Sequence, residues 1–335
     1  MKKLLLIFFL SIFQNLFSQT GGETLFAFLN TPTSPKQIAL GGNILTAATD
    51  VSQTLWNPSI ADTILSNEVA VNYVNYIADI NVGSFAYAKN IHPKYGTAFI
   101  GGQFFNYGDF DRTNADSPTV VGSFGASDLS INLGYAIRLH EWSIGATAKF
   151  INSKIDVYSA SAVLYDIGFT YYHPLKPFVF SVVMRNLGGS SIAFIDRADP
   201  ISSEITAAFE YQLEHVPIKI YGAANDLGNW DVSVPNPSRS KTDLENNITE
   251  EKISDINNLL RHLSLGAELW PQKKINLRIG YNHRRAQEFQ LSEVKTKAGL
   301  SYGLAFNAKK FRFDYAFSKF QEGAKFSTFG LTFHL

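Results

Sequence analysis

Apolar and polar residues alternate along most of the chain, from about residue 68 to the last residue. In the segment INLRIGYN (residues 275–282), apolar residues occupy every odd position, and Asn, Arg, Gly and Asn occupy the even ones. Alternation with a period of two predicts β-strands that have one apolar face. We expect about fourteen such strands, which begin near Glu68, Asp79, Tyr95, Asp128, Glu141, Ala160, Lys176, Ile201, Pro217, Leu259, Lys273, Val294, Lys310 and Lys325.

The connections between these segments alternate in length. One set is short: IHPK, LHE, HPLKP, EHVP, PQK and NAKK. The other set is mostly longer and spans residues 108–126, 187–200, 227–258 and 284–293, although its first member, near Ala78, is tight. Short turns on one side and long loops on the other are typical of outer-membrane barrels. An even number of strands brings both chain ends to the short-turn, periplasmic side.

Aromatic residues gather near the short turns. Such residues would form the aromatic girdle of a barrel at the periplasmic interface. The residues concerned are Tyr95, Trp142, Tyr171, Tyr172, Trp270 and Phe311.

The last ten residues, FSTFGLTFHL, also alternate and present an apolar face. We expect this strand to face lipid and to pair with the first strand, because an open sheet edge would leave unpaired backbone groups in hydrocarbon. A soluble secreted β-sandwich also alternates, so alternation alone does not separate the two folds. The strand number, the loop lengths, the girdle and the last strand favour an all-β transmembrane antiparallel β-barrel of about 14 strands.

The first residues predict export. Met1-Lys2-Lys3 supplies a positive start, residues 4–13 are apolar, and the run is too short to span a bilayer. We therefore expect a signal peptide over residues 1–18, cleaved between Ser18 and Gln19, and an outer-membrane location in a Gram-negative bacterium.

The next segment, residues 19–66, differs from the rest of the chain. It contains several prolines and a Gly-Gly pair but no long alternation. We expect it to form a plug, or hatch, within or beneath a barrel of residues 67–335. Small residues on the inner face would leave room for it.

Charge and composition narrow the function. The chain has 29 basic and 29 acidic residues, which argues against a nucleic-acid binder. No cysteine is present, so disulfides and thiolate metal sites are excluded. The charges expected inside the barrel have both signs, which suits either an ion path or, as we favour, a packed lumen of mutual salt bridges. They are Arg138, Lys149, Asp166, Arg185, Glu210, Glu268, Arg278, Lys295, Lys297 and Asp314.

No catalytic pattern is found. The seven histidines show no metal-ligand spacing, and four of them, His92, His140, His173 and His215, fall in the short turns. No nucleophile elbow, P-loop or dinucleotide fingerprint appears. We expect neither enzyme activity nor a metal or cofactor.

The loop of residues 227–258 holds a second feature. Thr242 and Glu245 fit the spacing of a capping box. Ile253, Ile256 and Leu259, with Leu260, would then share one face of a short helix. Two interpretations stay open: a lid over the barrel mouth, or a docking surface for a partner.

The segment GGETLFAFLNTPTSPKQIALGGNILTAATDVSQTLWNPSIAD carries a family resemblance. Its order of F-x-F-L, Pro-x-Ser, ALGG, Asp and Asn-Pro resembles the PorV/PorQ family of Bacteroidota, most of all its PorQ members. The wider FadL-like group shares fourteen-stranded barrels and an Asn-Pro-Ala element, where this chain has Ser59 in place of Ala. The matching residues are Phe26, Phe28, Leu29, Pro32, Ser34, Ala39, Leu40, Gly41, Gly42, Asn43, Ile44, Asp50, Asn57 and Pro58.

The resemblance implies a role in the type IX protein secretion system. There the chain would be a non-catalytic anchor of the cell-surface attachment complex, with PorU as sortase, PorV as barrel partner and PorZ as the surface protein that it holds. That complex processes cargo and links it to anionic lipopolysaccharide. The alternative is a FadL-like outer-membrane transporter of hydrophobic small molecules, which needs an apolar pocket reached from outside.

Overall fold

The structure is a computed structural model that describes residues 24–42, 44–76, 80–92, 94–114, 117–192, 194, 200–236, 241–242, 248–249, 251–289, 298–321 and 324–335. The predicted signal peptide and residues 19–23 lie outside the described residues. Within the described part, no helix is long and apolar enough to cross a membrane.

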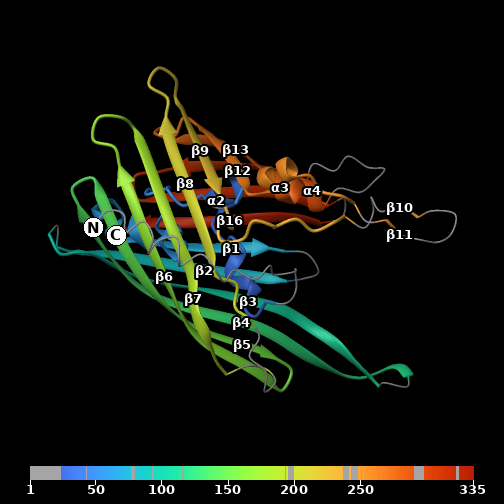
Figure 1. Cartoon of the computed structure of the whole chain (residues 1–335). Helices are drawn as coiled ribbons and strands as arrows, with labels where there is room; N and C mark the ends of the chain where they lie inside the picture. Colours follow the sequence, from blue (N-terminus) through green and yellow to red (C-terminus); the bar gives the residue numbers. More distant parts are fainter. Residues whose placement is uncertain are drawn as a thin grey trace, which may run out of the picture.

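Fourteen of the described strands close into one antiparallel barrel, which confirms the predicted fold class (Figure 1). The first and last strands close it, with Glu68 opposite His334 and Asn75 opposite Ser327. The barrel strands are β1 (Glu68–Asn75), β2 (Asn81–His92), β3 (Gly96–Asn114), β4 (Ser117–Leu139), β5 (Trp142–Ile155), β6 (Tyr158–Tyr172), β7 (Phe178–Ile192), β8 (Glu204–Gln212), β9 (Ile218–Ala224), β12 (Leu263–Leu269), β13 (Ile275–Asn282), β14 (Leu300–Asn307), β15 (Phe311–Gln321) and β16 (Ala324–His334).

Most strands begin within three residues of their predicted starts. The exceptions are instructive. β4 begins at Ser117 rather than near Asp128, because residues 108–126, predicted as a loop, continue β3 and β4 as a hairpin. β12 begins at Leu263 because a helix occupies the preceding residues, and β14 begins at Leu300 rather than near Val294.

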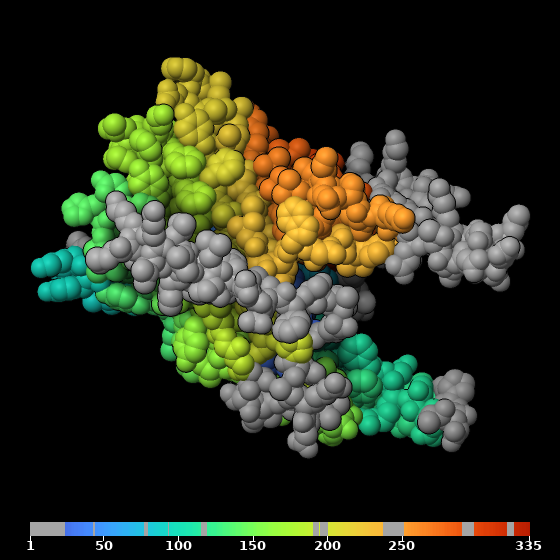
Figure 2. All heavy atoms as spheres, in the orientation of Figure 1, coloured from blue at the N-terminus to red at the C-terminus, as the bar shows by residue number. Residues whose placement is uncertain are grey.

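Strand length divides the wall into two sectors. β3 and β4 have 19 and 23 residues, and their outer parts, residues 109–114 and 117–125, project from the barrel as a two-stranded ribbon (Figure 1 and Figure 2). β9 and β12, on another side, have 7 residues each. A membrane-spanning strand needs about 9–11 residues, so the second sector is short for a bilayer.

The outside of the wall is apolar. Outward side chains such as Leu133, Leu277 and Phe329 are exposed, whereas their inward neighbours Asn132 and Arg278 are buried. This arrangement suits a lipid-facing surface. Of the aromatic residues near the short turns, Tyr95, Trp142, Trp270 and Phe311 are exposed as a girdle requires.

Two members of the predicted girdle differ from the others. Tyr171 is half-buried and packs against Trp142, with ring centroids 4.8 Å apart. Tyr172 is an inward residue, and the guanidinium of Arg138 lies 4.0 Å from its ring centroid. The prediction for Tyr172 was wrong because neighbouring residues on a strand face opposite sides.

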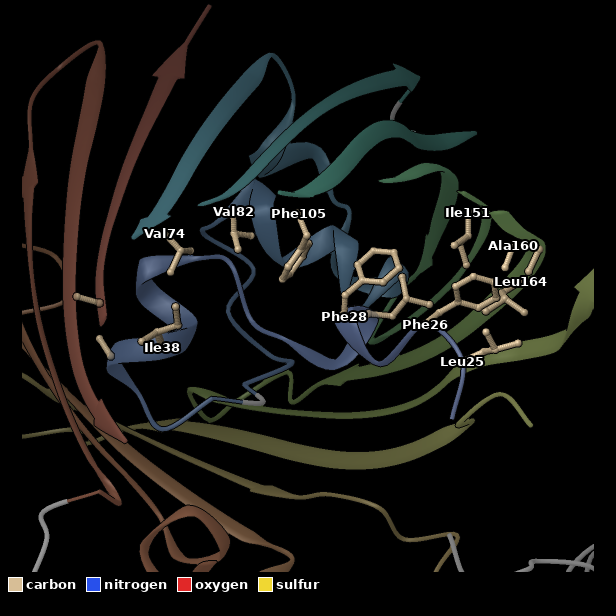
Figure 3. Packing of buried hydrophobic residues seen from close by; sticks show 14 residues of the cluster. Leu25, Phe26, Phe28, Ile38, Val74, Val82, Phe105, Ile151, Ala160 and Leu164 are labelled. Carbon is tan, nitrogen blue, oxygen red and sulfur yellow. The ribbon is translucent and has the colours of Figure 1, made fainter. Parts of the chain in front are cut away.

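The N-terminal segment lies inside the barrel and is called the plug here, over its described residues 24–66. It has four 3₁₀ turns and one short helix: η1 (Ala27–Asn30), α2 (Pro35–Ala39), η2 (Val51–Leu55), η3 (Pro58–Ile60) and η4 (Thr63–Leu65). Pro35 and Pro58 are each the first residue of their element, where a missing N–H costs nothing. Figure 3 shows Phe28 of the plug beside Phe105 of β3, and Phe26 near Ile151 and Leu164.

The remaining elements lie among the long connections. β10 (Lys241–Thr242) and β11 (Ile248–Thr249) form a separate two-stranded sheet. α3 (Asp255–Arg261) precedes β12, and α4 (His283–Glu288) follows β13. The predicted capping box is wrong, because Ser254 is the N-cap of α3 and accepts from Asn257 N. Thr242 belongs to β10, and Glu245 lies outside the described residues.

Candidate functional site

The motif residues of the plug hold its own fold together. Asp50 caps η2 by accepting from Ser52 N at 3.1 Å, and it also accepts from Ser34 Oγ at 2.7 Å. Asn57 caps η3, where its side-chain oxygen accepts from Ser59 N at 2.9 Å. The Asn57 side chain also donates to Leu45 O at 2.7 Å, which ties η3 to an earlier turn of the plug.

Gly41 and Gly42 form the tight turn that follows α2. Their φ angles are +101° and +114°, in the left-handed region that favours glycine. A Cβ on Gly41 would also lie 3.0 Å from the backbone oxygen of Leu265 in β12. The Gly-Gly pair therefore serves both the turn and a close approach to the wall.

Wall glycines meet the plug at many points. At each of them a Cβ would come within 3 Å of a plug atom, so these positions admit the plug only as glycine. The contacts are Gly101 with Leu55, Gly145 with Pro58, Gly168 with Asn57, Gly266 with Leu40, Gly280 with Gly41, Gly303 with Ala39 and Gly330 with Pro35. The sequence predicts room for a plug, and the structure shows which residues supply it.

A buried network of charges joins the plug to strands β12–β15. Arg278 donates to Glu268 at 2.9 Å and to Asp314 at 2.5 Å, and Arg312 donates to Asp314 at 2.6 Å. The plug adds Lys36, whose ammonium lies 3.7 Å from Glu268. It also adds Asp50, at 3.3 Å from Arg312. Three cations and three carboxylates thus alternate, and each lies beside an opposite charge.

A second set of buried pairs lies on β5–β8. Lys149 pairs with Asp166 at 2.7 Å, and Arg185 pairs with Glu204. Arg185 also lies over the ring of Trp56 in the plug, 3.9 Å from its centroid. Arg185 further donates to Asn30 Oδ1 at 3.3 Å.

The inner charges agree with the packed-lumen interpretation. Arg138 pairs with Asp62 of the plug, and Glu210 pairs with Lys219 at 3.0 Å. Lys295 and Lys297, which belong to the same prediction, lie outside the described residues. Charges of both signs that neutralise each other within the wall do not form an ion-selective lining.

An apolar cavity of about 440 Å³ lies on the outward side of the plug. It is lined by Leu25, Phe26 and Phe28 of the plug and by the outer parts of β3–β5, including Phe110 and Phe124. The two phenylalanine rings of the ribbon stack with centroids 5.5 Å apart. A cavity of this size and lining can hold a small apolar molecule.

One end of the cavity is polar. Asp128 accepts from Tyr107 Oη at 2.6 Å and from the hydroxyl of Ser153. Both carboxylate oxygens therefore already have a partner from the wall. Apart from Thr24, the remaining lining is apolar, so shape and hydrophobic contact would decide which molecule binds.

At the outward rim, the end of the barrel opposite the short turns, α4 connects neighbouring segments through two arginines. Arg284 pairs with Asp226 at 2.7 Å and with Glu288 at 2.9 Å. Arg285 donates to Ala298 O at 2.6 Å and to Ser301 Oγ at 2.6 Å. Burial raises the pKa of Asp226, and it lowers the pKa of the Arg285 guanidinium to about 10.

The residues predicted for docking lie at this rim. Ile256 and Leu259 are on α3 and are exposed, and Ile253 precedes the helix and is half-buried. Trp230, which is also exposed, lies against the same helix, because its backbone oxygen accepts from the Asn258 side chain. The sequence analysis did not single out Trp230, because a lone tryptophan in a long loop gives no periodic signal.

Among the described residues, no group of three or more His, Asp or Glu side chains could hold a metal ion. Two histidines outside the short turns have clear structural partners. The ring nitrogens of His262 lie 2.6 Å from Asn225 O and 3.1 Å from Trp230 O. His334 lies 2.9 Å from Glu68, which joins the last strand to the first.

Comparison with solved structures places the fold. The toluene transporter TbuX of Ralstonia pickettii superposes with a TM-score of 0.50 at 10% identity, covering 92% of this chain and 98% of that one. The chain thus has the fold of a FadL-like outer-membrane barrel. A deletion mutant of the monoaromatic hydrocarbon channel TodX gives a TM-score of 0.48 at 11% identity, covering 88% of this chain and 96% of that one.

The sequence comparisons add no closer relative. No protein-family model matches the chain, and no curated protein matches it. At this level of identity, the likeness to the solved structures concerns the fold and leaves the function to be argued from the site.

Proposed function

We propose that this protein is a non-catalytic outer-membrane anchor of a type IX secretion system, within the attachment complex that contains PorU, PorV and PorZ. One observation carries the proposal. The segment that resembles the PorV/PorQ family is the plug. Its motif residues form turns, helix caps and contacts with the wall: they are Gly41, Gly42, Asp50, Asn57 and Pro58. A motif used in this way supports a rigid body rather than a reacting site.

The filled lumen supports an anchor over a conduit. Wall glycines admit the plug backbone to van der Waals distance, and Lys36 and Asp50 enter a balanced set of ion pairs. Removing the plug would leave buried groups without these partners, at a cost of several kcal/mol. Passage of a solute through the lumen would require the plug to move, whereas holding a partner protein would not.

The outward end offers the surface for a partner. The ribbon of residues 109–114 and 117–125 projects from the barrel at the end opposite the short turns (Figure 1). A stable interface buries about 800 Å² on each partner, which short turns cannot supply. We propose that the ribbon and the loop of residues 227–258 together hold a PorZ-like surface protein, while lipid surrounds the wall.

Cross-linking in intact outer membranes tests this proposal. A tagged chain should capture PorZ-like protein together with PorU and PorV, as identified by mass spectrometry. Replacement of residues 110–124 by a short Gly-Ser turn should leave a heat-modifiable barrel but release the surface protein and leave cargo unprocessed. Removal of residues 238–249 alone spares both the ribbon and α3, and it therefore shows how much this part of the loop contributes to holding the surface protein. Normal cargo processing in a strain that lacks the whole protein would overturn the proposal.

A second candidate function is favoured by the cavity of about 440 Å³ beside Phe26, Phe28 and Phe124. Its apolar lining supports binding of a small hydrophobic molecule, as the name of TbuX states for that transporter. The test is fluorescence of N-phenyl-1-naphthylamine in matched detergent. Ala126→Phe, inside the cavity, should remove the protein-dependent signal, and Gly122→Phe, outside it, should not. Equal signals from both variants would exclude the cavity as the site.

A further inference from the structure

The short helix α3 is amphipathic in the opposite sense to a helix on a water-soluble surface. Two of its polar residues, Asn258 and Arg261, are buried, where Asn258 donates to Trp230 O and Arg261 donates to Val234 O at 3.2 Å, whereas Asp255 at the start of the helix is exposed. Its apolar residues Ile256 and Leu259 are 72% and 49% exposed. A helix in contact with water normally turns its apolar face inward, so the exposed residues Ile256 and Leu259 suit an apolar environment outside α3.

The exposed face continues into the lipid-facing wall. Leu259, in the last turn of α3, lies four residues before Leu263, the first residue of β12, and the helix runs almost directly into the strand. Leu263 and Leu265 are exposed, and between them Ser264 is buried on the inner side. His262 fixes the junction through its ring contacts with Asn225 O and Trp230 O. The outward leucines of strand and helix therefore form one surface.

The strands in this sector are too short to span the bilayer alone. β9 and β12 have 7 residues each, and a strand that crosses the hydrocarbon needs about 9–11. Figure 1 shows α3 at the end of β12 that lies away from the short turns, where the missing length is needed. In Figure 2 the orange spheres of this region extend the wall outward.

Trp230 gives a second observation at the same place. It is 61% exposed, and its backbone oxygen accepts from the Asn258 side chain, so it sits against α3. Tryptophan is enriched where hydrocarbon meets the polar headgroups. An exposed tryptophan in contact with Asn258 of α3 and with His262 suits the level at which an apolar belt ends.

We propose that the apolar face of α3, formed by Ile256, Leu259 and Leu260, lies in the acyl chains of the outer leaflet and completes the hydrophobic belt above β9 and β12. Its occupant is lipid, and the surface protein of the proposed anchor would then contact the ribbon and the polar parts of the rim. The inference rests on the barrel fold and holds for either candidate function.

Site-directed spin labelling tests the inference directly, because the natural chain has no cysteine. Single variants Leu259→Cys, Leu265→Cys and Lys252→Cys would be labelled and folded into phosphatidylcholine vesicles. Leu265 reports the lipid-facing wall, and Lys252 is an exposed residue in the loop before α3. Collision with oxygen marks lipid, and collision with a water-soluble nickel chelate marks water.

The oxygen-to-nickel ratio at Leu259 should match that at Leu265 and exceed that at Lys252 several-fold. A ratio at Leu259 equal to that at Lys252 would overturn the inference and leave this face to a protein partner. Heat-modifiable migration checks that each variant is folded. If Leu259→Cys does not fold, Ile256→Cys gives the same readout with the same two outcomes.

Discussion

Strands β12–β15 form ion pairs with charged side chains of the plug, whereas among the described residues strands β5–β7 meet neutral groups of the plug. On the first wall, Lys36 and Asp50 of the plug join the ion pairs of Glu268 and Arg312. On the second wall, Ser59 shares a 2.7 Å hydrogen bond with Thr170. Here the wall charges pair with each other, as Lys149 does with Asp166.

The comparison separates two properties of the plug: how closely it packs against the wall, and what fixes its position. Both walls carry glycines that let the plug approach to contact distance, Gly266 and Gly280 on one side, Gly145 and Gly168 on the other. Close fit is therefore common to both walls, whereas ion pairs with the plug are found on the β12–β15 wall; on the β5–β7 wall, Arg185 meets the neutral groups of Trp56 and Asn30. A buried ion pair is costly to break once formed, so the β12–β15 wall fixes the position of the plug. The β5–β7 wall packs closely against the plug but forms no ion pair with its described residues.

The largest effect should come from removing the close fit. In Gly280→Val the new Cβ would lie 2.1 Å from Gly41 N, and the next nearest atom is also backbone. Neither side can yield, so we expect the folded barrel to be largely lost, measured as the heat-modifiable band on a gel. Gly122→Val is the control, since no atom lies within 4 Å of its Cβ position. Wild-type assembly of Gly280→Val would mean that the plug does not touch this wall.

The next effect should come from breaking the charge network at its centre. Arg278→Met would deprive both Glu268 and Asp314 of their shared partner inside the wall. Loss of one member of a buried pair costs about 3–5 kcal/mol, measurable by reversible guanidinium unfolding in lipid vesicles. Arg112→Met is the matched control. Its pair with Asp156 is exposed and should contribute about 0–1 kcal/mol. Equal losses in the two variants would show that the network does not stabilise the barrel.

The sequence predicted the barrel well because the period-two pattern records which face of each strand is covered. The pattern of INLRIGYN places Arg278 inside and Leu277 outside, and the structure agrees. It could not identify the partners of Arg278, since Glu268 on β12 and Asp314 on β15 reach it only through the register of the neighbouring strands, which the pattern does not record.

Three other features could not be predicted from the alternation of apolar and polar residues. Residues 108–126 contain Gly, Asp and Pro, which indicate a loop, yet pairing across the hairpin extends β3 and β4 through them. The cavity depends on side chains from the plug and three strands, so no single segment carries its signal. α3 was recognised by its apolar spacing, but spacing alone cannot say that this face points away from the protein.

A charge placed on the other side of the same strand should cost somewhat less than the break at Arg278. Leu277 is exposed on the outer face of β13, next to the buried Arg278. Leu277→Arg should destabilise the barrel by about 2–4 kcal/mol if this position lies near the bilayer midplane. The measurement is again unfolding in vesicles. Ile275→Arg, outward and close to the short turn, should cost about 0–1 kcal/mol. A Leu277→Arg barrel as stable as the natural one would place this face in water.

The smallest loss of stability should arise at the β5–β7 wall, where the described contacts with the plug are hydrogen bonds to neutral groups. Asn57→Ala removes the 3.3 Å hydrogen bond to Thr170 Oγ1 of β6, together with the donor to Leu45 O and the acceptor of Ser59 N, all of them buried. Leaving such groups unpaired costs about 1–3 kcal/mol, less than the loss expected at Arg278. The control is Asn106→Ala, where an exposed side chain accepts from Gly108 N and its loss should change stability by no more than about 0.5 kcal/mol. Unfolding in vesicles ranks the variants. If Asn57→Ala costs as much as Arg278→Met, the β5–β7 wall holds the plug as firmly as the β12–β15 wall. The ion pairs would then not be what fixes the position of the plug.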